Sequence, residues 1–323
     1  MATSGSKNFT YTRNDIIFAA LRKIGEFDSG ETPDGDITSD AAQALNLLIN
    51  ELTGIYDANI FLRTELTLFL QKGQQKYSVG PSGDNVTAAY VETKLNGGEP
   101  TSETAMVVDS ITGVSNGDYI GVEVDDGSIH WTTVNGSPSS STITLTTGLD
   151  DAAADNSRVY AYTTKAYRPI AINPEAVIRR DANDYDTSIQ LIGEGEYYSL
   201  SQKGNSGPLT QAYYKSSLTD GTLYVWPTGD GQTDKIVFVA HYYPDDFDSA
   251  ANNAEFPVEW GKALIYGLAS DLAPEFQLPE RQQVRLYQHS QILRENALML
   301  MLRMPMCNSA GHINETPSRG RCV

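Results

Sequence analysis

The sequence FPVEWGKALIYGLASDLAPEF, at residues 256–276, decides the helical part of the fold. Pro257 suits the first position of a helix, where the amide hydrogen that proline lacks would have no partner. Apolar residues then recur at three- and four-residue spacing, which predicts one helix face packed in the core: Trp260, Leu264, Ile265, Leu268 and Leu272. Pro274 ends this helix, and we expect its acids Glu259 and Asp271 to lie on the surface.

A longer helix follows, from Pro279 to about Arg303. At the usual rise of 1.5 Å per residue it would be roughly 37 Å long. Its last part, ALMLMLRM at residues 297–304, is apolar on every side, so we expect other protein to cover this end. The remaining residues, 305–323, have the composition of a flexible tail, with Arg319 and Arg321 near its end.

Two helices are also predicted at the N-terminus. Thr12 and Asp15 form a capping pair in front of an apolar stripe that ends at Gly25. After a polar loop, Ser39 is predicted to cap a second helix. Each helix has one apolar stripe, so the two must cover one another or a third element.

The spacing then changes to the two-residue period of strands. Alternation in residues 63–80 predicts two strands around a turn at 72–75, a β-hairpin. From 81 to 165, short strands separated by turn residues predict a small all-β domain, a sandwich or barrel, inserted in the main fold. This insertion has twelve acids and three bases, a charge of −9 and half of the total.

These patterns predict an α+β fold in four segments. Residues 1–80 supply the N-terminal helices and hairpin of the main domain, and 81–165 form the acidic β-domain. Residues 166–304 supply a β-rich segment and the C-terminal helices that complete the main domain, and 305–323 form the tail.

Composition excludes several classes of protein. The chain of 323 residues has a formal net charge of −18, which argues against wrapping duplex DNA, because that requires clustered Lys and Arg. The cysteines, Cys307 and Cys322, both lie near the end, so no disulfide framework is expected. The first residues do not resemble a signal peptide and no window is apolar enough for a membrane span, so we expect assembly in a cytoplasm.

The candidate chemical groups favour structural roles, so we expect no enzyme and no catalytic, cofactor-binding or metal-binding residues. The four histidines, His130, His241, His289 and His312, lack the spacing of a zinc site. The acids of YPDDFDSAANNAEF, at 243–256, miss the ligand pattern of a calcium loop. Glu194 and Glu196 are expected to be solvated loop acids. The tyrosine pairs are expected to pack in the core and in interfaces: Tyr197–Tyr198, Tyr213–Tyr214 and Tyr242–Tyr243.

Several phrases, taken together, resemble the head-to-tail adaptor family of short-tailed bacteriophages, also called tail accessory factors. The matching pieces, in chain order, are AALRKIG with the GETP loop, TSDAAQALNLLINEL, LRTELTLFLQKGQQKYSVG, AYRPIAI, GEYYSLSQKGNSGPLTQAYY, GTLYVWPTGD, HYYPDDFDSAANNAEFPVEWGKALIYGLASDLAPEF and the final helix. They span most of the chain except 81–165 and the tail, and this chain departs from compact members of the family in that insertion.

The resemblance implies a helical connector-type core that assembles as a ring of twelve copies beneath the portal protein of a virion. Such a ring extends the DNA channel and is a platform for tail nozzle and fibre proteins, with DNA passing only as cargo. The family's C-terminal segment reaches along the portal, which makes these residues candidates for portal contact: Leu298, Met299, Leu300, Met301, Leu302, Arg303, Met304, Arg319 and Arg321.

Two other functions stay open. A tail protein that attacks cell wall or surface polysaccharide would use aromatic clusters and an acid pair such as Glu194 and Glu196. A tail or baseplate module that binds without the portal would place its function in the insertion, 81–165.

Overall fold

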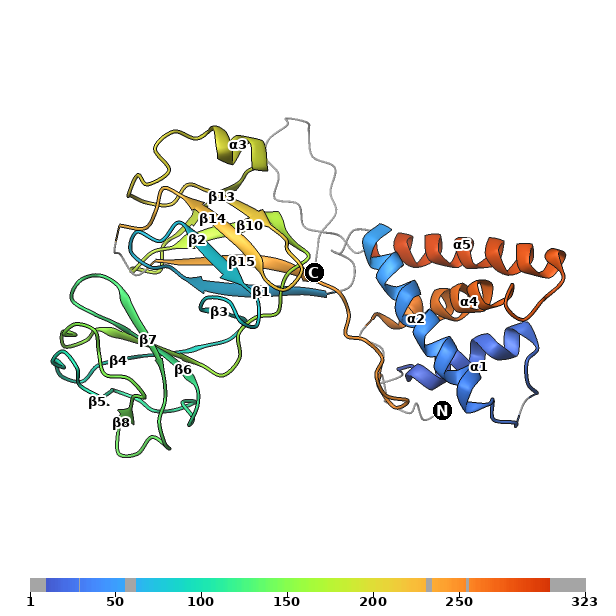
Figure 1. Ribbon diagram of the computed structural model, residues 1–323, viewed down its shortest axis with the longest axis horizontal. Coiled ribbons are helices and arrows are strands. Elements are labelled where there is room, and N and C mark those ends of the chain that lie inside the picture. The colour runs from blue at the N-terminus through green and yellow to red at the C-terminus, as the bar shows by residue number, and fades with distance from the viewer. Residues whose placement is uncertain (1–9, 29, 56–61, 231–233, 254–255, 303–323) are drawn as a thin grey trace, which may run out of the picture. The chain divides into compact units, whose positions relative to one another are not determined.

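The structure is a computed structural model that describes residues 10–28, 30–55, 62–230, 234–253 and 256–302 (Figure 1). It has a mixed α+β fold that divides into two compact units. The helical unit comprises Met1–Tyr56 with Pro244–Val323, and the β unit comprises Asp57–Tyr243. The boundary between the units differs from the predicted segments, which grouped residues 1–80 together. The strand at 62–69, which follows the N-terminal helices, pairs with the strand at 235–242 and so belongs to the β unit.

In the helical unit, α4 (Gly261–Leu272) is the central helix. It packs against α1 (Arg13–Ile24), α2 (Gly35–Ile55) and α5 (Glu280–Leu302). The apolar face of the sequence motif points into this core, where the following side chains are at most 9% exposed: Trp260, Leu264, Ile265, Leu268 and Leu272. The α4 helix is therefore packed against helices from both the N-terminal and the C-terminal part of the chain.

The helix starts follow local hydrogen bonding. The predicted cap of α1 is confirmed, since the Asp15 amide donates to Thr12 Oγ1 at 3.2 Å and the Thr12 amide donates to Asp15 Oδ2 at 3.0 Å. The start predicted at Ser39 is wrong, because the Asp36 amide already donates to Asp34 Oδ1 at 3.1 Å and α2 begins at Gly35. The helix predicted from Pro257 opens instead with one 3-10 turn, Val258–Trp260 (η2).

The β unit is built on two facing sheets. The five-stranded sheet has the order β11-β10-β15-β1-β3, and the four-stranded sheet has the order β12-β13-β14-β2. Apolar side chains from both sheets, including Leu68, Val79, Leu223 and Phe238, pack into one core between them. The strands are β1 (Leu62–Phe69), β2 (Lys76–Val79), β3 (Val86–Thr87), β10 (Ala171–Arg180), β11 (Asp186–Ser188), β12 (Gln190–Leu191), β13 (Gln211–Lys215), β14 (Gly221–Trp226) and β15 (Lys235–Tyr242). A short helix, α3 (Glu194–Ser199), lies between β12 and β13.

The predicted hairpin at 63–80 is wrong. Both strands exist, but β1 pairs along its whole length with β15, whereas β2 pairs with β14 in the other sheet. The turn at 72–75 therefore carries the chain from one sheet to the other, with Gly73 at φ +70°. Both strands bury apolar side chains in the shared core, and this burial is available only if they face one another.

The insertion has strands and a core of its own. Its main sheet has the order β4-β9-β6-β7, and β5 pairs with β8. Its core includes Leu95, Ile120, Ile143 and Val159, all fully buried. The strands are β4 (Val91–Lys94), β5 (Ala105–Val107), β6 (Tyr119–Glu123), β7 (Ile129–Thr133), β8 (Thr142–Thr144) and β9 (Arg158–Tyr162).

Candidate functional site

The insertion is attached to the facing sheets through a contact that we call the docking seam, which combines a cluster of aromatic rings with a network of polar contacts. Phe69, at the end of β1, is the centre of the ring cluster and is 1% exposed. Its ring centroid lies 4.8 Å from that of Tyr160, and 5.1 Å from those of Tyr90 and Trp131. Ring pairs at these separations contribute about 0.5–1.5 kcal/mol each beyond their burial.

The polar part of the seam is organised around Lys235, which opens β15. Its ammonium group lies 3.2 Å from Glu92 Oε2 and 3.9 Å from Asp184 Oδ1. The rings of Tyr160 and Tyr90 lie 5.2 and 5.5 Å from the same nitrogen. A lysine that is 1% exposed needs such compensation, because an isolated buried charge is strongly destabilising.

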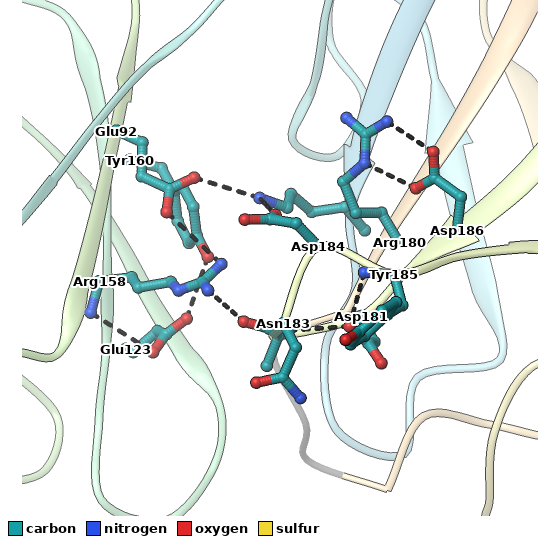
Figure 2. Close-up of polar contacts among 12 residues, drawn as sticks. Glu92, Glu123, Arg158, Tyr160, Arg180, Asp181, Asn183, Asp184, Tyr185 and Asp186 are labelled. Carbon is teal, nitrogen blue, oxygen red and sulfur yellow. Dashed lines mark hydrogen bonds and ion pairs between the residues drawn. The ribbon is translucent and has the colours of Figure 1, made fainter.

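Arg158 connects β9 to the loop between β10 and β11. Figure 2 shows its guanidinium group pointing across the seam, where it donates to the backbone carbonyl of Ala182. The same group lies 3.4 Å from Glu92 Oε1, so Glu92 is shared between Arg158 and Lys235. On the insertion side, Tyr160 donates its hydroxyl to Glu123 Oε1 at 3.0 Å.

The loop that receives Arg158 is itself held in one shape. Asp181 Oδ1 accepts from the backbone amides of Asn183 and Tyr185 at 2.8 and 3.0 Å. Arg180 donates two hydrogen bonds to Asp186, at 2.8 and 2.9 Å, and this pairing lowers the pKa of the Asp186 carboxyl below its ordinary value. A pre-shaped loop loses less entropy when it is held against the insertion.

A third contact joins the two parts through backbone atoms. The Gln71 side chain donates to the carbonyl of Ile129 at 2.8 Å and accepts from the amide of Ile129 at 3.1 Å. Lys72 Nζ also donates to the carbonyl of Asp126 at 2.6 Å. These bonds tie the connection after β1 to the start of β7, so the insertion is attached at several separate points.

The titration behaviour of the seam reflects burial. Burial raises the pKa of the Tyr160 phenol above its ordinary value, and the charges of Glu123 and Glu92 raise it further. The phenol therefore stays protonated at neutral pH and remains a hydrogen-bond donor. In the part of the chain that the structure describes, no three His, Cys, Asp or Glu residues are grouped to hold a metal ion. The ion pairs and ring contacts of the seam therefore hold the insertion in a fixed position on the facing sheets.

The predicted portal-contact residues fall on and beyond the end of α5. Leu298 is half-buried, while Met299 and Leu300 are 56% and 53% exposed. Met301 and Leu302 belong to the last turn of α5, and nothing is described of their side chains. Arg303, Met304, Arg319 and Arg321 lie outside the described residues.

The predicted chemical groups are dispersed over the described structure. His130 Nδ1 lies 2.8 Å from Asp150 Oδ2, His241 is buried on β15, and His289 stands edge-on to Tyr266 at 4.5 Å. His312 lies outside the described residues. In the loop before the C-terminal helices, Asp248 Oδ1 accepts from the Asn252 side chain at 2.6 Å, an arrangement that stabilises a turn.

Glu194 and Glu196 lie on α3, where the expectation was a loop, and both are exposed. Glu196 Oε2 accepts from the Gly193 amide at 3.1 Å and so caps its own helix. The neighbouring Tyr213 and Tyr224 rings are stacked 5.5 Å apart on the four-stranded sheet. Tyr213 and its neighbour Tyr197 on α3 are buried, whereas Tyr198 and Tyr243 of the paired tyrosines are exposed.

Sequence reasoning missed the docking seam as a whole, although two local signals existed. Leu68, Phe69 and Leu70 are consecutive apolar residues in an otherwise alternating strand, a pattern that indicates cover on both faces of the sheet. Lys235 directly precedes the apolar run IVFVA, where a lysine has to find a partner. Neither signal predicts which residues contact Phe69 and Lys235, because Glu92 and Tyr160 are far away in the sequence.

No helix among the described residues is long and apolar enough to cross a membrane. Comparison with protein-family models finds no match, and comparison with curated proteins finds no significant one.

Proposed function

We propose that the chain is a structural protein of a short-tailed phage virion, a head-to-tail adaptor whose copies form a ring of twelve on the portal protein. The helical unit is the connector-type core in this proposal. The ring extends the DNA channel and carries the nozzle and fibre proteins, and the chain is not an enzyme. The sequence resemblance is the starting point, and three further features support the proposal.

The observation that carries the proposal is the exposed apolar end of α5. Met299 and Leu300 are adjacent in the sequence and both are more than half exposed at the last described turns. Neighbouring exposed apolar side chains, unlike a single one, mark a contact surface. An apolar helix end that leads into the C-terminal tail suits docking on another protein.

The other two features concern charge and rigidity. The net charge of −18 suits the wall of a channel through which DNA passes without adhering. The docking seam holds the acidic insertion against the facing sheets through rings, ion pairs and backbone hydrogen bonds. A rigid arm of this kind suits a platform for further tail proteins, because a fixed geometry lowers the entropy cost of binding.

Purified portal rings provide the test. The double substitution Met299→Asp with Leu300→Asp is expected to weaken binding of the full chain to portal rings at least about tenfold, because it places two charges in the proposed contact. Leu218→Asp is the matched control, since Leu218 is 95% exposed in the β unit. Undiminished binding of the α5 variant would remove this end of the helix as the docking site.

The same pair of variants separates the portal-independent alternative. If the protein binds tail components through the insertion, 81–165, both variants keep that binding and the wild-type chain shows no affinity for portal rings. An activity on wall or capsule polysaccharide would favour the other alternative, provided that it is lost in the Glu194→Gln, Glu196→Gln variant.

A further inference from the structure

We infer that copies of this chain associate through two exposed helix surfaces, with an acidic strip on α2 of one copy lying along a basic strip on α5 of the next. The inference rests on the proposed function for the closure of these contacts into a ring. It goes further by naming the two surfaces and their register. The contact itself can be tested in the absence of any portal protein.

The α2 strip is acidic and has one exposed leucine near its middle. Its members recur at the spacing of one helix face and are all exposed: Asp36, Asp40, Gln43, Leu47 and Asn50. Leu47 is 64% exposed, the most exposed large apolar side chain described in the helical unit. The sequence has no Lys or Arg between Lys23 and Arg63, so nothing nearby along the chain neutralises the strip.

The α5 strip has the opposite charge at its N-terminal end. Its members also recur on one face and are all exposed: Arg281, Arg285, Gln288, Ile292 and Glu295. Ile292 is 53% exposed, and Val284, one turn after the helix start, is 48% exposed. The opposite side of α5, with Ser290, Arg294 and Ala297, is buried in the helical unit.

The two strips match position by position when the helices run parallel. Both use the same spacing of four, three, four and three residues. In this register Asp36 and Asp40 oppose Arg281 and Arg285, Gln43 opposes Gln288, Leu47 opposes Ile292, and Asn50 opposes Glu295. Opposite charges, paired amides and paired aliphatic side chains are the complementarity that fixes the register of an interface.

The charges of the strips favour a heterologous contact. α2 and α5 both pack against α4 (Figure 1), and the strips consist of exposed residues on these two different helices. Two α2 strips would bring Asp36 and Asp40 against like charges, which disfavours a symmetric dimer through this surface. A surface that binds a different surface of the next copy generates a closed ring or an open filament.

A charge exchange at one position tests the contact. Asp40→Arg alone and Arg285→Asp alone are each expected to weaken self-association about fivefold, since an exposed attraction becomes a repulsion. The double variant Asp40→Arg with Arg285→Asp restores the attraction in every contact and should return to within about twofold of wild type. Asp246→Arg is the matched control, because Asp246 is an exposed acid of the same unit outside both strips. Sedimentation velocity at low salt measures association.

Cysteine pairing tests the geometry. In a chain with Cys307→Ser and Cys322→Ser, the pair Leu47→Cys and Ile292→Cys should form a ladder of oligomers on mild oxidation. Leu47→Cys alone, Ile292→Cys alone and the control pair Leu47→Cys with Leu218→Cys should give no ladder. The inference would be overturned by an equal ladder in the control pair or by dimers from Leu47→Cys alone. It would also be overturned if the double charge variant associated more weakly than either single variant, or if the wild-type chain did not associate.

The two proposals fail separately. Portal binding is tested at Met299 and Leu300, whereas self-association is tested at Asp40, Leu47, Arg285 and Ile292. Absence of portal binding by the wild-type chain, with intact ladders, would refute only the proposed function. Portal binding by the wild-type chain without ladders would refute only this contact.

Discussion

Removal of the Phe69 side chain should loosen the insertion without unfolding it. Phe69 is 1% exposed, and four aromatic rings lie with centroids 4.8 to 6.4 Å from its own. Phe69→Ala deletes a whole ring from a site whose neighbours are held by β7, by β9 and by the residue before β4, so they cannot close the cavity. Substitutions of this kind cost about 3–5 kcal/mol, and we expect the upper half of that range because the rings are held apart.

Urea denaturation followed by tryptophan fluorescence measures this loss, and Trp131 lies in the ring cluster itself. Phe69→Leu keeps most of the volume and should cost about 1–2 kcal/mol. Tyr185→Ala is the matched control in the same unit, since Tyr185 is 72% exposed and its loss should change stability by less than about 0.5 kcal/mol.

Hydrogen exchange then tests where the loss is located. The amide of Ile129 donates to Gln71 across the seam and should exchange faster in Phe69→Ala. Amides between β6 and β9 should keep their relative protection, because the core of the insertion includes Ile120 and Val159 but not Phe69. A cost below about 1 kcal/mol, or loss of protection throughout β6 and β9, would refute the reasoning.

Three further predictions concern single groups. Lys235→Met should destabilise the β unit by about 1–2 kcal/mol in urea denaturation. This is less than the cost of breaking an isolated buried ion pair, because Glu92 remains paired with Arg158. The double variant Lys235→Met with Glu92→Gln should lose less stability than the sum of the losses in the two single variants. Burial raises the pKa of the Asp234 carboxyl in the folded protein above its value in the unfolded chain, so the wild-type protein should lose stability as the pH rises through these two values. Asp234→Asn should lack this loss in urea denaturation series between about pH 3 and 7. A variant whose stability changes with pH in parallel with the wild type would contradict the assignment. Gly261→Ala should lower the melting temperature of the helical unit, at a cost of about 1–3 kcal/mol, because its Cβ would lie 2.1 Å from Tyr11 Cε2, whereas Gly35→Ala meets nothing within 4 Å and should not destabilise it.

Local signals predicted the elements well and their partners poorly. The cap at Thr12 and the apolar face from Trp260 to Leu272 depend on residues within a few turns, and both occur as expected. The start of α2 was misplaced because Ser39 and Asp34 are both good caps and periodicity alone does not choose between them. Pairing failed at 63–80, because a strand followed by a turn and another strand has the same local pattern whether or not the strands pair.

The candidate sites divide in the same way. The apolar end of α5 was visible in the sequence, and the structure shows that Met299 and Leu300 are exposed. The docking seam was not visible, because Phe69, Glu92, Arg158 and Lys235 come from four distant strands. Spacing rules apply along one element, and they contain no information about which elements meet.

By itself the sequence determined the mixed α+β class, the helix face around Trp260 and the acidic composition of the insertion. Only the tertiary structure decided that β1 and β2 belong to opposite sheets, that both chain ends build one helical unit, and that Lys235 is neutralised by a carboxylate of the insertion. The physical reason is that capping and amphipathicity are energies of neighbours along the chain. Burial of a strand face, or of a single charge, is decided by whichever distant segment best excludes water from it.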